Sequence, residues 1–257
     1  PGGDPARLMA PFAGGDPHRE KSLFFLHNNT NKRSAVLDVR TPDGAEAFKR
    51  LVSEADVVLE TFKPGLMATL GLDYERLSAL NPALIMTSIT PFGQTGPHRD
   101  FEGPDIVSVA MGGLLYLEGE PGERPYTMPR YQAWQMAGIH AAYGTLLALY
   151  ERLRSGRGQW VDVSVQEVLA HQMFTLSLFG SIQQIPTRMG QTSQNPPNTY
   201  FPCRDGKWVH LSVYQDSEWQ NLVDWIKDPV LSDPSFIDSS YRQAQVEVVD
   251  ALVTAYT

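Results

Sequence analysis

The stretch ADVVLETFKPGLMATLGLDYERLSALNPALIMTSIT, residues 55–90, decides the fold class of this chain. It opens with an apolar, β-branched run over 55–62 and closes with a second one over 83–90, and such runs are typical of buried strands. Between them, residues 73–82 carry the signals of a short helix, with Asp73 as its cap and Pro82 as its stop. Two apolar strands joined through a helix predict a parallel sheet with right-handed crossovers.

The residues before this stretch extend the same rhythm. The run AVLDV over 35–39 predicts another strand, and a helix follows to about Val52, with Thr41 as N-cap and Pro42 at its first position. Alternation of strands and helices predicts an α/β fold. Ligands of such open sheets bind beyond the carboxyl ends of the strands, so the loops 61–65 and 90–97 are candidate binding loops.

The residues after this stretch predict more helices and one more strand. An apolar helix is expected over 105–117, a long helix over 133–153, a strand over 159–165 and a helix over 166–182. The long helix repeats bulky apolar residues with a period of 3.6, which predicts that this stripe is buried against the core. The stripe consists of Met136, Ile139, Tyr143, Leu146, Leu147, Tyr150 and Leu153.

The chain is expected to comprise two domains. Residues 1–182 form a large α/β domain and 199–257 begin a smaller α+β domain with a β-hairpin, joined by a Gln-, Pro- and Asn-rich linker over 183–198. The first residue is Pro1 rather than Met, and the chain stops at Thr257 within a helical apolar pattern. We therefore expect both domains to be incomplete, the large one at its N-terminus and the small one at its C-terminus.

Composition excludes several classes of protein. A hydrophobic fraction of 42% supports a buried core, and a net charge of -8 argues against a general nucleic-acid binder. The single cysteine, Cys203, excludes an internal disulfide and a cysteine-based zinc site, and the histidines lack metal-ligand spacing, so no metal is expected. No apolar run is long enough for a membrane span and no signal peptide is present, so we expect a cytoplasmic protein without membrane contact.

Several ordered segments across about residues 1–225 together resemble the class III coenzyme A transferases of the CaiB/BaiF type. They are NKRSAVLDVRTPDG, ADVVLETFKPG, LGLDYERLSALNPALIMTSITPFGQTGP, the GPDIV motif and SGRGQWVDVSVQE. The resemblance implies an interlocked dimer with a large CoA-binding domain and a smaller domain threaded through the partner. It also implies a CoA thioester and a small carboxylic acid as substrates. The expected assembly is a homodimer, with a heteromeric or fused homologous partner as the alternative.

The resemblance implies CoA contacts at three strand ends. Backbone N–H groups in such loops hold phosphates, and Arg40 and Lys63 add positive charge. Gln94 either binds the thioester or the pantetheine, or it stabilises its own turn. The implied positions are Leu37, Asp38, Val39 and Arg40, then Thr61, Phe62 and Lys63, and then Thr90, Pro91, Phe92, Gly93 and Gln94.

The resemblance breaks at the catalytic position. In these transferases an Asp at the mouth of the long helix attacks the acyl-CoA thioester, and that Asp aligns with Trp134, whose indole has no nucleophilic oxygen. The related racemases use a His/Asp pair, and its His aligns with Pro104. Glu151 lies about 25 Å further along the helix and cannot substitute. Asp105 is the nearest candidate carboxylate, with a helix cap as its alternative role.

Three more residues near this position are candidates for substrate contact. Arg130 and Gln132 flank Trp134, and Arg130 could pair with a substrate carboxylate. His140 is either a core histidine or a base. Three functions stay open: a transferase using a displaced carboxylate, a catalytically silent CoA-binding half of a two-part transferase, and an acyl-CoA lyase, hydratase or isomerase using another acid or base.

Overall fold

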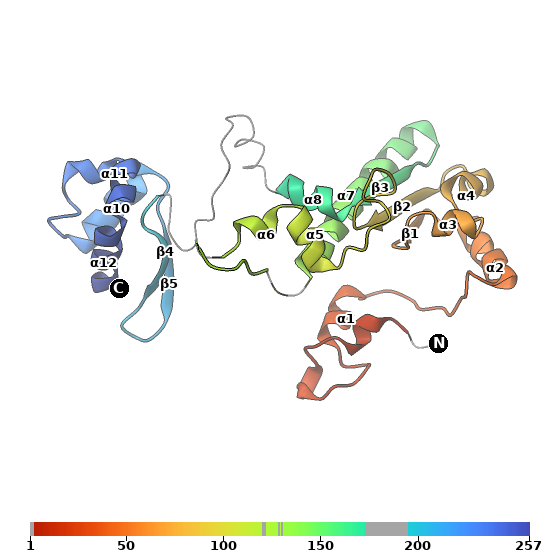
Figure 1. Ribbon diagram of the computed structural model, residues 1–257, viewed down its shortest axis with the longest axis horizontal. Coiled ribbons are helices and arrows are strands. Elements are labelled where there is room, and N and C mark those ends of the chain that lie inside the picture. Colours follow the sequence, from red (N-terminus) through yellow and green to blue (C-terminus); the bar gives the residue numbers. More distant parts are fainter. Residues whose placement is uncertain (1–2, 120–121, 128, 130, 173–194) are drawn as a thin grey trace. The chain divides into compact units, whose positions relative to one another are not determined.

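Figure 1 shows the helices and strands of the computed structural model of the chain. The chain divides into two compact units. The first unit is formed by Pro1–Ser88 and Gly144–Val161, and the second by Ile89–Tyr143 and Asp162–Thr257. The structure describes residues 3–119, 122–127, 129, 131–172 and 195–257.

The predicted parallel sheet is present. Strand β1, Val57–Glu60, pairs in parallel with β2, Ile85–Thr90, in a register that runs from Val57 opposite Ile85 to Glu60 opposite Ser88. Strand β3, Trp160–Ser164, completes the order β1-β2-β3. Every residue of β2 is buried, as expected for a central strand. The α/β fold class is therefore confirmed.

Helices of the first unit pack around this sheet. They are α2, Pro42–Val52, α3, Leu66–Thr69, and α4, Tyr74–Leu80. As predicted, Thr41 caps α2, since its Oγ1 accepts a hydrogen bond of 3.2 Å from the N–H of Gly44. The three helices and the sheet share one apolar core, which consists of Val52, Val58, Met67, Leu72, Leu77, Leu84 and Met86.

The N-terminal part contains only short helices, and the predicted strand over 35–39 is not formed. These helices are η1, Pro5–Leu8, η2, Ala13–Gly15, and α1, Leu23–Asn28. Residues 32–38 lack regular secondary structure, and Val36 is 81% exposed. The prediction failed because a strand needs a neighbour that completes its hydrogen bonds, and no described strand lies beside this segment.

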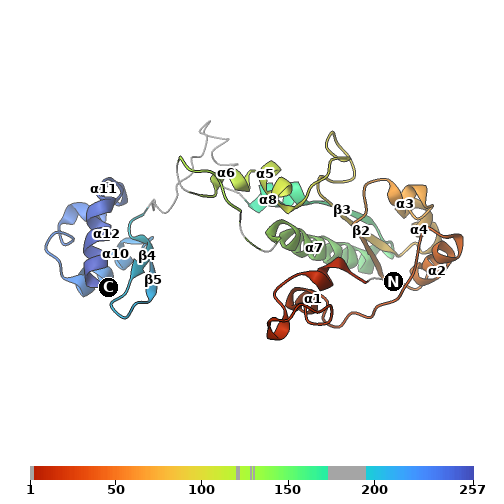
Figure 2. The same cartoon turned by 60° about the horizontal axis from the view of Figure 1, so that its bottom comes forward.

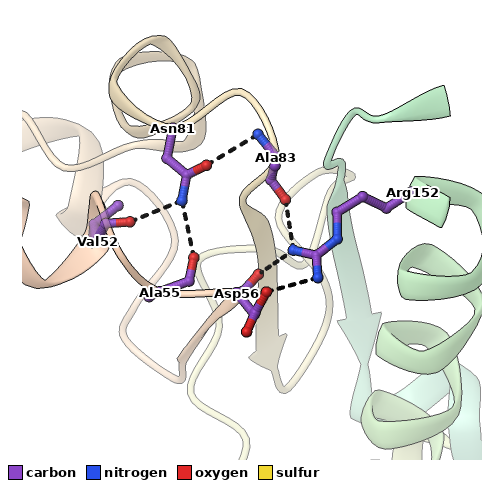
Figure 3. A network of polar contacts seen from close by, with 6 residues as sticks. All are labelled: Val52, Ala55, Asp56, Asn81, Ala83 and Arg152. Carbon is purple, nitrogen blue, oxygen red and sulfur yellow. Dashed lines mark hydrogen bonds and ion pairs between the residues drawn. The ribbon is translucent and has the colours of Figure 1, made fainter.

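A network of polar contacts joins the starts of β1 and β2 to the long helix α7, Gln132–Ser155 (Figure 3). The Arg152 guanidinium donates to the backbone oxygen of Ala83 at 3.0 Å and to Asp56 Oδ1 at 2.7 Å. The Asn81 amide donates to the backbone oxygens of Val52 and Ala55 at 3.0 and 2.9 Å. Side chains thus satisfy the backbone groups at this end of the sheet.

Helix α7 buries its small residues, not its large ones, so the prediction of a buried bulky stripe was wrong. In both views its C-terminal half lies beside the sheet (Figures 1 and 2), and Thr145 Oγ1 is 2.7 Å from Thr87 Oγ1. Small side chains allow the helix axis to approach the strands closely. The buried face consists of Ala133, Ala137, Ala141, Thr145 and Ala148. Of the bulky residues in the predicted stripe, six are more than half exposed: Ile139, Tyr143, Leu146, Leu147, Tyr150 and Leu153.

The predicted helix over 105–117 is divided into α5, Asp105–Met111, and α6, Leu114–Leu117. The division falls at Gly113, whose φ of 90° is incompatible with a continuous right-handed helix. Gly112 permits close packing as expected, because a Cβ there would lie 2.6 Å from the Leu169 Cβ. Leu169 belongs to α8, Val165–Gln172, which confirms the first half of the helix expected over 166–182; residues 173–182 lie outside the described part.

The C-terminal part forms the expected hairpin and helices. Strands β4, Asn198–Pro202, and β5, Trp208–Ser212, pair antiparallel. They pack on helices through a core that includes Phe201, Trp219 and Val249. The helical elements are α10, Asp216–Ile226, η3, Pro234–Ile237, α11, Ser239–Ala244, and α12, Val246–Tyr256. The linker over 183–198 and the domain boundaries set by it stay predictions, since residues 183–194 lie outside the described part.

Candidate functional site

The turn that follows the extended segment is held rigidly by its own side chains. Arg40 pairs with Asp38 through two hydrogen bonds, from Nε at 2.8 Å and from Nη2 at 3.0 Å, and this pairing lowers the pKa of the Asp38 carboxyl. The Thr41 side chain donates to the Asp38 backbone oxygen at 2.9 Å. Gly44 packs on the same oxygen, where a Cβ would come within 1.9 Å. The first expected CoA segment thus has a fixed shape.

An open cleft of about 620 Å³ borders this turn. Three of the expected CoA residues, Leu37, Asp38 and Arg40, lie on its wall, whereas Val39 packs against the core of the first unit. Two arginines that the sequence did not single out, Arg7 and Arg19, line the same cleft. Their only signal was positive charge within the Gly- and Pro-rich N-terminal loop. The full lining comprises Gly3, Arg7, Arg19, Glu20, Ser34, Ala35, Val36, Leu37, Asp38 and Arg40.

The second expected segment follows β1. Thr61 and Lys63 are exposed, and the Phe62 ring is 43% exposed. The buried Glu60 carboxylate accepts a hydrogen bond of 2.7 Å from the backbone N–H of Phe62. Glu60 therefore fixes the start of this loop and leaves the next three side chains at the surface.

The third expected segment, after β2, belongs to the second unit and is anchored by Asp162 on β3. Asp162 Oδ2 accepts from the backbone N–H of Gln94 at 2.9 Å. Gly93 has a φ of 82°, and a Cβ there would lie 3.6 Å from the same oxygen. Phe92 is buried, Pro91 is half-buried, and Thr90 is buried with no hydrogen-bond partner for its Oγ1 among the described residues. The buried residues give this loop a defined shape.

Asp105 lies beside the backbone at the start of α7, where Trp134 aligns with the family Asp in the expected resemblance. Its Oδ1 accepts from the backbone N–H of Ala133 at 3.1 Å, and the N–H of Trp134 also donates to this carboxylate. Asp105 thus caps the N-terminus of the 24-residue helix α7 rather than its own helix, since α5 is capped by Pro104 without a side-chain bond. Burial raises the pKa of Asp105, although these backbone hydrogen bonds oppose that effect.

The neighbouring candidates take local roles. Trp134 is half-buried, and the Gln132 amide donates to the Pro129 backbone oxygen at 3.1 Å. His140 Nδ1 lies 3.0 Å from the Met136 backbone oxygen, and its Nε2 lies 3.4 Å from the Gln172 amide nitrogen. A histidine held in this way is typical of a structural residue. Arg130 lies outside the described residues.

The described part of the chain contains neither a metal-binding cluster nor a membrane-spanning helix. It holds no cluster of three or more His, Cys, Asp or Glu side chains that could coordinate a metal ion. None of the described helices combines the length and the apolar character that crossing a membrane requires.

Comparisons with known proteins give one consistent result. The family model described as CoA-transferase family III matches residues 1–257. Subunit BbsE of succinyl-CoA:(R)-benzylsuccinate CoA-transferase from Thauera aromatica is 34% identical, over 95% of this chain and 62% of its own length. The beta subunit of succinyl-CoA–L-malate CoA-transferase from Chloroflexus aurantiacus is 35% identical, over 98% of this chain and 62% of its own length. The chain thus spans about three fifths of the length of these relatives.

A solved structure supports the same relationship. The crystal structure of a CAIB/BAIF family protein from Brucella suis matches with a TM-score of 0.83 and 32% sequence identity. The match covers 99% of this chain and 68% of the Brucella chain. The similarity therefore extends through both units of the structure.

Proposed function

Because this chain belongs to CoA-transferase family III, we propose that it binds CoA or an acyl-CoA and that a homologous partner supplies the acylated carboxylate. In the family reaction, a carboxylate oxygen attacks the thioester carbonyl carbon, the carbon–sulfur bond breaks, and the CoA thiolate leaves as a mixed anhydride forms. This chain would then be the CoA-binding half of a two-part transferase.

The observation that carries the proposal is the state of the α7 N-terminus. The resemblance aligns Trp134, in the first turn of α7, with the family Asp, and an indole cannot be acylated in this way. The nearby Asp105 carboxylate is already bound by two backbone N–H groups of α7. An attacking carboxylate oxygen needs a free approach to the thioester, and hydrogen bonds to the anion reduce its nucleophilicity.

Two further observations support a partner. Some relatives of this chain are named as subunits of two-part CoA-transferases. In addition, α7 exposes a stripe of large apolar side chains, which single chains rarely leave in water. A homologous chain with Asp at this position would both cover the stripe and complete the chemistry.

A second candidate function is favoured by the position of Asp105. Its burial raises its pKa, so its carboxylate is more basic than an ordinary aspartate, and it lies beside the backbone of Trp134. If Asp105 left its backbone donors, it would become the acyl acceptor itself. The chain would then be a self-sufficient transferase with a relocated nucleophile.

Trapping of the acyl intermediate distinguishes the two candidate functions. The full-length protein is incubated with succinyl-CoA and hydroxylamine, and the modified residue is located by mass spectrometry. We expect no modified Asp or Glu in the wild type, although it binds CoA in titration calorimetry. Trp134→Asp is expected to gain a modification at position 134, with Trp134→Asn as the matched control. Modification of Asp105 in the wild type would support the second candidate, and absence of CoA binding would refute both.

A further inference from the structure

Two arginines approach each other closely at the N-terminal wall of the cleft. A Cβ built on Gly3 would lie 3.3 Å from the Nε of Arg7 and 3.4 Å from the Nη2 of Arg19. Both guanidinium groups therefore lie next to Gly3, and their positive charges repel each other. Such an arrangement favours binding of an anion between or beside them.

The carboxylates of the cleft pair with Arg7 and Arg40 and leave Arg19 without a partner among the described residues. Glu20 is engaged by Arg7, whose Nη1 lies 2.8 Å from both carboxylate oxygens, and Asp38 is engaged by Arg40. Arg19 has no carboxylate within ion-pair distance among the described residues. The cleft thus holds three guanidinium groups and two carboxylates, and the unpaired charge belongs to Arg19.

Arg7 is held in place, whereas Arg19 is free to reach a ligand. The Arg7 guanidinium lies 4.0 Å from the centre of the Phe25 ring, and its side chain is only 21% exposed. Arg19 is exposed and lines the cleft. The cleft lining also includes Val36 and Leu37, whose exposed apolar surfaces suit the face of a nucleobase.

We propose that Arg19, supported by Arg7, binds a phosphate group at the nucleotide end of CoA. The inference rests on the proposed function in taking CoA as the ligand, and it adds a specificity-determining residue outside the three strand-end loops. A planar guanidinium suits this role because it donates two parallel hydrogen bonds to a phosphate.

The test compares four forms of the full-length protein by titration calorimetry: wild type, Arg19→Gln, Arg19→Lys and the control Arg154→Gln. Arg154 is also an exposed arginine, and it lies on α7 away from the cleft lining. The probes are CoA and adenosine 3′,5′-bisphosphate, which carries phosphates without the pantetheine arm. We expect Arg19→Gln to weaken the binding of both probes about tenfold, since one charge-assisted hydrogen-bonding group is lost. Arg19→Lys should lose less, and Arg154→Gln should bind as the wild type does.

A Glu20→Gln variant gives a readout of the opposite sign. Removal of this negative charge from the cleft should tighten the binding of adenosine 3′,5′-bisphosphate, which a folding defect would not do. If the wild type binds CoA and Arg19→Gln binds it equally well, the inference is wrong while the proposed function stands. If the wild type binds neither probe, the proposed function fails as well.

Discussion

At the residue scale, one carboxylate joins two helices that are distant in sequence. Asp105 is the first residue of α5, and it accepts hydrogen bonds from the first turn of α7, 28 positions later. A helix N-terminus has unpaired N–H groups and a partial positive charge, so an anion there is stabilising. Burial acts in the opposite direction, and its effect on the pKa of Asp105 is the larger one.

The first prediction is a pH-dependent difference between the wild type and Asp105→Asn. Because the folded-state pKa of Asp105 is raised, the folded state holds its proton more tightly than the unfolded state does. The wild type should therefore lose stability relative to the variant as the pH rises from below the ordinary value of 3.8 through the raised pKa. Urea denaturation of both proteins over this range measures the difference, and a constant difference would show that Asp105 carries no burial penalty.

The second prediction concerns Arg152, whose guanidinium spans the starts of two strands. Arg152→Met should lower the free energy of unfolding by about 1–2 kcal/mol, because the Ala83 carbonyl loses a charged donor. The ion pair with Asp56 adds little, since that carboxylate is largely exposed. Arg154→Met is the matched control, two positions along the same helix and exposed. Equal stabilities of the two variants in denaturant titrations would contradict the role given to the network.

At the element scale, local signals predicted the elements that depend on local chemistry. The strands β1 and β2 and the hairpin β4–β5 were predicted because apolar runs and turn residues mark them directly. The segment 35–39 has equal strand propensity but no neighbouring strand among the described residues, and pairing is not visible in a local pattern. Periodicity also predicted α7 but not which of its faces meets the sheet, since both a bulky and a small-residue stripe run along it.

The third prediction compares two glycines, one with no space for a Cβ atom and one with ample space. Gly158 precedes β3, and a Cβ there would lie 1.8 Å from the Leu84 backbone oxygen, so Gly158→Ala must displace a strand. We expect a loss of about 3 kcal/mol or more. Gly138 lies within α7, and apart from the backbone of its own helix no atom lies within 4 Å of its Cβ position, so Gly138→Ala should raise stability by about 0.5–1 kcal/mol. Thermal unfolding of both variants checks the opposite signs, and two shifts of the same sign would contradict the predicted packing.

At the scale of the whole molecule, the candidate site was only partly predictable. Resemblance placed CoA contacts at 37–40, and the structure adds a cleft at this turn. Arg7 and Arg19, which line the same cleft, lie in a loop without periodicity, so only the three-dimensional fold relates them to the turn. The sequence marked Asp105 as the carboxylate nearest to Trp134 but not as a cap of α7, since helix caps are usually sought within a few residues of the helix that they serve.

The exposed stripe of α7 gives the last prediction, which concerns assembly. Its six large side chains run from Ile139 to Leu153 on one face, and an apolar surface of this kind favours association. We therefore expect the full-length protein to associate through this face, either with itself or with a homologous partner. A charge within the stripe, Leu146→Glu, should dissociate the assembly, because an unpaired carboxylate is costly to bury.

Leu80→Glu on α4 is the matched control, since Leu80 is also exposed and apolar but lies outside the stripe. Light scattering on the full-length protein, expressed alone and with its homologous partner, gives the mass of each assembly. Dissociation by Leu146→Glu but not by Leu80→Glu would place the interface on α7. A wild type that stays a single chain in both preparations would contradict both this interface and the proposal that a partner completes the chemistry.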